Sequence, residues 1–244
     1  MKSLIAAIRF ITVLSVGKYQ VFEPKGMIPY FPIVGILLGG MVAAFDNVVG
    51  QMWSVPVVSL LDVIFLVFLT GAFHLDGLGD TADGLLSHRS KERALAIMKD
   101  SRVGVMGLVA IVCALSIKWA GIAGLEDHRS MLLVIIPAYA RGGMIAGIRF
   151  LEYGRADSGI GRDFLGERLK FTAFAGLLIP VFLSLLMGMK ALWLNGWFIV
   201  STLAILRYYR KRMGCVTGDM LGAMVEFLES ILFLISSTGR DSMI

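Results

Sequence analysis

The sequence has little of what stabilises small secreted domains or binds soft metals. It contains only two cysteines, Cys113 and Cys215, and neither has a C-x-x-C partner or another metal-ligand spacing. Cys113 falls in an apolar run and Cys215 in a polar segment, so neither a disulfide between them nor a zinc site is expected. Charged residues make up only 17% of the chain, and no linker or low-complexity segment occurs. A separate extramembrane domain is therefore not expected.

Apolar residues dominate what is present. The chain is 57% hydrophobic with a mean hydropathy of +0.79, which is too apolar for a soluble domain of this size. Runs long enough to cross a bilayer recur along it. They cover about 28–49, 53–75, 103–124, 131–150, 171–189, 191–206 and 219–235. The sequence predicts an all-α polytopic integral membrane protein with about seven transmembrane helices, in which residues 1–244 form one membrane-embedded domain.

The N-terminal segment 2–17 is apolar but short, and it contains Arg9. No small-x-small cleavage site follows it, which argues against a signal peptide. An interfacial helix, lying in the membrane surface, suits this composition better.

Basic residues are distributed unevenly about the predicted spans. With the N-terminus in the cytoplasm, eighteen Lys and Arg residues fall on the cytoplasmic side, and only Arg129, Lys190 and Arg240 fall outside. The positive-inside rule then predicts a multi-pass protein of the cell (inner) membrane with a cytoplasmic N-terminus and cytoplasmic polar loops. The net charge of +5 mostly reflects this asymmetry, so no nucleic-acid partner is expected.

Three carboxylates follow the second apolar run. Asp76, Asp80 and Asp83 are spaced by four and three residues, so on a helix they share one face. Like charges placed this way repel, whereas Mg²⁺ takes carboxylate oxygens and shares its other positions with water and phosphate. The glycines between them allow a bulky ligand to approach the backbone. The cluster predicts a metal–diphosphate site, with a solvated loop start at 76–102 as the alternative.

Two further polar segments fall on the same predicted side. The segment 151–170 contains Arg155, and the last apolar run begins with Asp219 and contains Glu226 and Glu229. Carboxylates for a metal and arginines for phosphates would thus meet in one pocket. For any single basic residue, anchoring at lipid headgroups is the alternative. For Asp219 the alternative is a helix cap, and for Glu226 it is an interhelical hydrogen bond.

A few charged residues fall within or near the ends of predicted spans. Asp62 and Arg141 both lie mid-span, and a buried pair between them is the arrangement of lowest cost, with ligand binding by Arg141 also open. Lys118 and Asp46 lie near outer helix ends and are expected to extend toward the interface. His74 lies beside the carboxylates as a ligand or general base, with a helix-end hydrogen bond as the alternative.

Four ordered motifs resemble those of the cobalamin synthase (adenosylcobinamide-GDP ribazoletransferase) family. They are Gly71–Gly84, Ile97–Gly104, Tyr139–Arg141, and Thr217–Ala223 followed by Glu226. The resemblance covers the whole chain. The departures from the family pattern, at Gly79, Val105-Met106 and Cys215, remove no carboxylate.

The resemblance implies a transferase that joins α-ribazole, or its 5′-phosphate, to adenosylcobinamide-GDP. GMP is released, and adenosylcobalamin or its 5′-phosphate forms. Mg²⁺ is the implied cofactor, the partners are these small molecules and membrane lipid, and homo-oligomer formation stays open. The candidate residues are Asp76, Asp80, Asp83, Asp219 and Glu226 for the metal, Asp83 and His74 for catalysis, and Arg102, Arg141, Arg155 and Asp100 for substrate binding.

Two other functions stay open. CDP-alcohol phosphotransferases also hold metal ions on Asp-Gly-rich clusters, but their signature has an Ala-Arg pair that the Asp76–Asp83 cluster lacks. An ion-coupled transporter would use Asp62, Arg141 and Glu226 near the midplane. Against a transporter, the carboxylates gather at one helix end on one side of the membrane.

Overall fold

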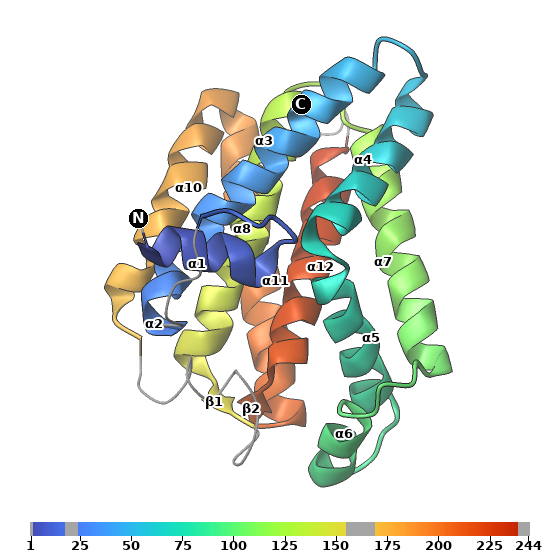
Figure 1. Ribbon diagram of the computed structural model, residues 1–244, viewed down its shortest axis with the longest axis vertical. Coiled ribbons are helices and arrows are strands. Elements are labelled where there is room, and N and C mark those ends of the chain that lie inside the picture. The colour runs from blue at the N-terminus through green and yellow to red at the C-terminus, as the bar shows by residue number, and fades with distance from the viewer. Residues whose placement is uncertain (1, 18–23, 155–168, 239–244) are drawn as a thin grey trace.

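A computed structural model describes residues 2–17, 24–154 and 169–238. Apart from one short pair of strands, the described elements are helices (Figure 1). The first half contains α1 (Lys2–Ile11), α2 (Pro24–Met27), η1 (Ile28–Tyr30), α3 (Phe31–Val49), α4 (Val55–Thr70), α5 (Phe73–Leu86), α6 (Lys91–Ile97) and α7 (Val105–Ala123). The second half contains α8 (Arg129–Phe150), β1 (Glu152–Tyr153), η2 (Phe171–Leu177), α10 (Leu178–Ser184), η3 (Leu185–Met187), α11 (Met189–Arg212), β2 (Cys215–Val216) and α12 (Gly218–Ser236).

The all-α polytopic membrane fold is confirmed. Four helices of the described chain are long and apolar enough to cross a membrane, or five if α4 and α5 count as one bent span. They are Ile28–Val49, Val105–Ala123, Arg129–Phe150 and Met189–Arg212. Each of the seven predicted apolar runs is largely helical, but a total of seven spans stays a prediction.

Helix α8 lies at the centre of the bundle, with 89% of its apolar stretch buried. Gly35 and Gly39, one turn apart on α3, face its backbone at Ala138 and Val134. A side chain at either glycine would collide with that backbone, so the small-xxx-small spacing is what allows the two helices to approach. This contact fixes α8 as the support for the helices that contain the polar residues.

The helix predicted over 53–75 breaks at Gly71, and α5 leaves α4 at an angle of 91°. Gly71 and Ala72 both have left-handed φ angles, of 60° and 58°. The N–H of Ala72 bonds to the carbonyl of Val67, and that of Gly71 to Phe68, which is a Schellman ending. The left-handed conformation of Ala72 costs about 1–2 kcal/mol. The break turns the carboxylates into a new helix, so the loop expected from residue 76 is wrong as far as Leu86.

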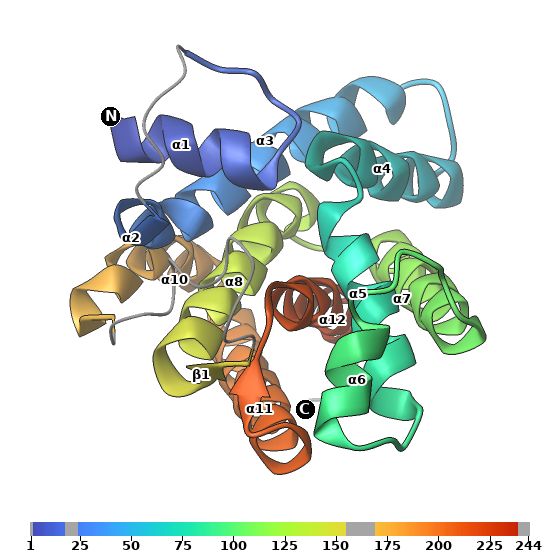
Figure 2. The same ribbon diagram turned by 60° about the horizontal axis from the view of Figure 1, so that its bottom comes forward.

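Polar segments from three parts of the chain meet at one end of the bundle (Figure 2). Strand β1 pairs in parallel with β2, which joins the chain after α8 to the chain before α12. At the end of α11, the Arg210 side chain donates to the Phe150 carbonyl, and that of Arg212 donates to the Arg89 carbonyl, both at 3.0 Å. The predicted clustering of these segments on one side is confirmed for the described residues.

The N-terminal segment forms a helix, as predicted. Helix α1 lies across the long helices (Figure 1), and the segment that follows it contacts the region of the α4–α5 break through Val13, whose N–H bonds to the Leu69 carbonyl. Phe10 stacks on Phe31 of α3 at 6.4 Å between ring centroids. Placement of α1 in a membrane surface stays a prediction.

Candidate active site

The three carboxylates lie on one helix, α5, as their spacing predicts. Asp76 is exposed, while Asp80 and Asp83 are partly buried. Residues four apart on a helix are neighbours, so Asp76 and Asp80 present adjacent carboxylates toward one end of the bundle.

The first turn of α12 crosses α5 next to these carboxylates. A Cβ atom on Gly77 would lie 2.7 Å from the Asp219 carbonyl oxygen, and one on Gly222 would lie 3.3 Å from the Cα of His74. The two glycines therefore allow backbone-to-backbone contact between the helices. This contact places Asp219 beside the helical turn that contains Asp76 and Asp80, as the family motifs imply.

The cap of α12 is Thr217 rather than Asp219. The Thr217 hydroxyl accepts a hydrogen bond from the Met220 N–H at 3.3 Å. Asp219 lies in the first helical turn, where a negative charge interacts favourably with the helix dipole. The interpretation of Asp219 as the cap is wrong.

Asp83 fastens the start of α7 to α5. Its two carboxylate oxygens accept hydrogen bonds from the backbone N–H groups of Gly104 at 2.7 Å and Gly107 at 2.8 Å. Any side chain at either glycine would collide with this carboxylate. Asp83 thus has a structural role that the sequence did not indicate, and its role as ligand or base stays a prediction.

The Asp83 anchor also holds the segment that contains Asp100 and Arg102. These two side chains form an ion pair of 2.6 Å, in which the Arg102 side chain is 85% exposed. Hydrogen bonds from the Arg102 side chain and backbone lower the pKa of Asp100 to about 2. Arg102 is thereby held as an exposed cation two residues from the Asp83 anchor. Arg155 lies outside the described residues.

Four charged side chains form a buried cluster inside the bundle. Lys118 of α7 donates to Glu226 at 2.7 Å and to Glu229 at 2.6 Å, and Arg141 of α8 donates to Glu229 at 2.6 Å. All four are buried, and their formal charges cancel. The cluster ties α7 and α8 to α12.

The cluster corrects several expectations. Lys118 does not extend toward the interface. Glu226 and Glu229 lie two and nearly three turns along α12 from Asp219, about 10 and 15 Å at 1.5 Å per residue. Arg141, paired with Glu229, is thereby held inside the bundle rather than beside Asp76, so its part in phosphate binding gains no support.

The predicted Asp62–Arg141 pair is wrong. Asp62 instead accepts from Arg129 at 3.0 Å, and Arg129 also binds Asp46 at 2.6 Å. Asp46 is therefore buried in a pair instead of extending toward the interface. Arg129, the first residue of α8, thus pairs with the carboxylates of α3 and α4.

His74 is fully buried at the crossing of α5 and α12. Within the described residues neither of its ring nitrogens has a hydrogen-bond partner. Gly222 packs against its backbone, which makes room for α12. This position favours a role in holding the crossing, and a catalytic role stays a prediction.

The contributions of Lys118 and of the glycine pairs were missed from the sequence. Lys118 stands well inside the run 103–124, and a charge at such depth needs a partner. That signal could have predicted a pair for Lys118, although the partner depends on which helices pack together.

A magnesium ion fits part of the proposed ligand set. Among the described residues, no three Asp, Glu, His or Cys side chains come close enough to hold an ion together. Mg²⁺ commonly binds through one or two carboxylates and leaves its other positions to water and substrate phosphate. The carboxylates of Asp76 and Asp80, one helical turn apart on α5, suit that mode.

Comparison with known proteins decides the family. The model of the cobalamin-5-phosphate synthase family matches residues 3–237. The chain belongs to this family. The resemblance inferred from the four motifs is confirmed, and the bent α4–α5 pair with its carboxylates is part of the matched region.

Curated members of the family are similar along nearly the whole chain. A protein of Roseiflexus sp. (strain RS-1) is 36% identical over 92% of this chain and 85% of its own length. One of Alkaliphilus metalliredigens (strain QYMF) is 34% identical over 98% of this chain and 97% of its own. Both are named adenosylcobinamide-GDP ribazoletransferase. No solved structure matches the chain significantly.

Proposed function

We propose that this cobalamin-5-phosphate synthase family member is an adenosylcobinamide-GDP ribazoletransferase. The observation that carries the proposal is the contact of α5 with α12 at Gly77. There the Asp219 backbone lies against the helical turn that contains Asp76 and Asp80, and these residues belong to two separate family motifs. The names of the curated relatives supply the reaction.

The reaction exchanges a phosphoanhydride bond for a phosphate ester bond. A hydroxyl oxygen of α-ribazole, or of its 5′-phosphate, forms a bond to the phosphorus nearer the corrinoid. The bond from that phosphorus to the bridging oxygen breaks, GMP leaves with the electron pair, and the hydroxyl proton passes to a base. Catalysis of such a transfer rests on positioning and on stabilising negative charge.

Asp76 and Asp80 would hold Mg²⁺, and Asp219 would complete the acidic surface from α12. When bound, the ion neutralises charge on the diphosphate and on the leaving GMP. Arg102 is exposed beside the anchored start of α7 and is the described arginine best placed to contact a phosphate. Asp83 keeps that segment against α5, and its hydrogen bonds favour a positioning role.

The pairing of the midplane charges argues against a transporter. Asp62 is bound to Arg129, Glu226 to Lys118, and Arg141 to Glu229. An ion pathway through these residues would have to break ion pairs that are buried and neutral. Asp76, Asp80 and Asp83 lie together on α5, away from these ion pairs.

We further propose that the end of the bundle with Asp76, Asp80 and Asp219, here called the acidic end, faces the cytoplasmic side of the cell (inner) membrane. The basic ends of α6, α8 and α11 lie at that end, as the positive-inside rule requires. With Cys113 replaced by serine, a cysteine at exposed Ser130 should react with an impermeant reagent on intact cells, and one at exposed Ser90 should not. The reverse labelling pattern would invert the orientation.

The activity test uses detergent-purified protein with adenosylcobinamide-GDP and α-ribazole. GMP and adenosylcobalamin should appear in equal amounts with Mg²⁺, and EDTA should stop both. Full activity after removal of divalent ions would reject the metal. Failure to form GMP under any condition, with solute movement across vesicles, would reject the transferase.

A further inference from the structure

A hollow of about 420 Å³ lies at the acidic end of the bundle, between the end of α8 and the last turns of α11. Its lining has an apolar part, here called the floor, and a basic part, here called the rim. The apolar residues are Phe150, Leu203 and Leu206, and the basic residues are Arg207, Arg210 and Lys211. One hollow therefore offers both an apolar surface and three cations.

The three cations lie on one side of α11. Residues 207, 210 and 211 are spaced by three and four, so they are neighbours on the helix surface and repel one another. Within the described part of the chain, none forms an ion pair with a carboxylate. Arg210 donates to the Phe150 carbonyl at 3.0 Å, which satisfies the end of α8 and holds the rim in place.

The hollow opens on the apolar outer surface of the protein. Leu203 is 59% exposed and Phe150 is 44% exposed. Arg149 lies over the Phe150 ring at 5.4 Å from its centroid, which adds a fourth positive charge nearby. In a membrane, this combination meets acyl chains on the floor and phosphate at the rim.

The substrate diphosphate is a poorer match for this hollow. Tyr208 and Tyr209 of α11 line a different cleft, shared with Leu78 and Leu85 of α5. Residues 203, 206, 207, 210 and 211 lie on the reverse side of α11 from those tyrosines. A phosphate in the hollow is thus separated from Asp76 and Asp80 by α11 itself.

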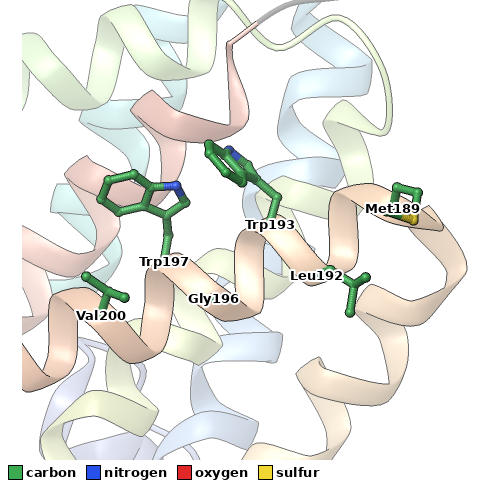
Figure 3. Close-up of a pocket in the computed structure, with 6 residues that line it drawn as sticks. All are labelled: Met189, Leu192, Trp193, Gly196, Trp197 and Val200. Carbon is green, nitrogen blue, oxygen red and sulfur yellow. The ribbon is translucent and has the colours of Figure 1, made fainter. Parts of the chain in front are cut away.

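Another hollow on α11 shows the difference that charge makes. It measures about 530 Å³ and is lined by Met189, Leu192, Trp193, Gly196, Trp197 and Val200 (Figure 3). Among the described residues no charged side chain lines it, and the neighbouring Lys190 is paired with Asp127 at 3.2 Å. Nothing there selects one lipid over another.

We propose that the hollow at Phe150 and Arg207 binds an anionic phospholipid whose headgroup carries two phosphates. Three rim cations exceed what one phosphate neutralises, and the floor receives the start of an acyl chain. The proposal does not depend on the transferase activity.

The test measures lipid retained by the purified protein in native mass spectrometry. The probes are tetraoleoyl cardiolipin, dioleoyl phosphatidylglycerol and dioleoyl phosphatidylcholine. Affinity should fall in that order, with the first about a hundredfold above the last, because three basic residues near the phosphates favour the lipid of highest negative charge. Equal occupancy by all three lipids would overturn the proposal.

A matched pair of variants locates the site. Arg207→Gln with Lys211→Gln should lower cardiolipin affinity about thirtyfold, and it leaves Arg210 to hold α8. The control, Arg89→Gln with Arg93→Gln, removes the same charge from exposed residues outside the hollow and should change little. Equal losses of cardiolipin from both variants would show only non-specific attraction of the lipid to basic residues, and would overturn the proposed site.

Competition distinguishes the two sources of phosphate. GDP at millimolar concentration should leave cardiolipin bound to the wild-type protein. This test needs no variant, so its result does not depend on whether a variant folds. Displacement of the lipid by GDP would assign the hollow to the substrate and overturn the lipid site.

Discussion

Helix α12 contains two groups of acidic residues in opposite circumstances. Glu226 and Glu229 are buried and neutralised by Lys118 and Arg141. Asp219, two turns earlier, lies at the end of the bundle beside an acidic turn of α5. Where charges cancel inside the bundle, they hold helices together. At the end of the bundle, where the Asp219 backbone lies against the α5 turn of Asp76 and Asp80, we instead propose a magnesium ion.

Removing one of the two cations of the buried cluster should have the largest effect. Lys118→Met leaves Glu226 without a partner and should lower the free energy of unfolding by about 3–5 kcal/mol. Thermal unfolding in detergent measures the loss. Adding Glu226→Gln restores neutrality and should recover much of it, while activity at low temperature persists in the double variant. An unchanged melting temperature in Lys118→Met would show that the cluster is not structural.

Removing a carboxylate from α5 should lower activity and leave stability nearly unchanged, which is the reverse of the effect expected in the buried cluster. Asp80→Asn removes a charged ligand and should lower kcat/KM by about a hundredfold, with stability changed by less than about 0.5 kcal/mol. Asp127→Asn, an exposed acid at the other end of the bundle, is the control and should be fully active. A well-folded Asp80→Asn protein with normal turnover at saturating Mg²⁺ would remove Asp80 from the site.

The spacing between the two helices can be tested without touching a carboxylate. Gly77→Ala places a Cβ atom 2.7 Å from the Asp219 carbonyl oxygen, so α12 must shift. Activity should fall about tenfold, because misplacement by a fraction of an ångström weakens shared contacts. Gly196→Ala, where a Cβ atom meets nothing within 4 Å, is the matched control. Equal activity of the two variants would mean that the crossing does not set the site.

The smallest effect concerns the exposed Asp100–Arg102 pair. The folded-state pKa of Asp100 is lowered to about 2, from an ordinary value of 3.8. Its contribution to stability is therefore complete above pH 3.8 and is lost as the pH falls through about 2. The melting-temperature difference between wild type and Asp100→Asn should be constant from pH 5 to pH 8. A difference that changes within that range would contradict the pairing.

The sequence predicts what depends on periodicity. The spacing of Asp76, Asp80 and Asp83 indicates one helix face, and the charge asymmetry indicates one polar end; the structure has both. The break at Gly71 was missed because Ala72 is not a residue expected in a left-handed conformation.

The sequence did not predict which of the buried charged residues form ion pairs with one another. Arg141 and Asp62 were the obvious mid-span pair, but each bonds to another residue because the packing of α3, α4, α7, α8 and α12 decides which charges meet. The contact of Asp219 with Gly77 was anticipated only through the family motifs, since 142 residues separate the two positions.

The most direct test of a site shared by α5 and α12 is a double-mutant cycle on Asp76 and Asp219. Turnover and the Mg²⁺ concentration for half-maximal activity are measured for Asp76→Asn, Asp219→Asn and the double variant. If both residues act on one ion, each single change nearly abolishes activity and the double variant is little worse. An active Asp219→Asn protein with an unchanged Mg²⁺ requirement would contradict the shared site.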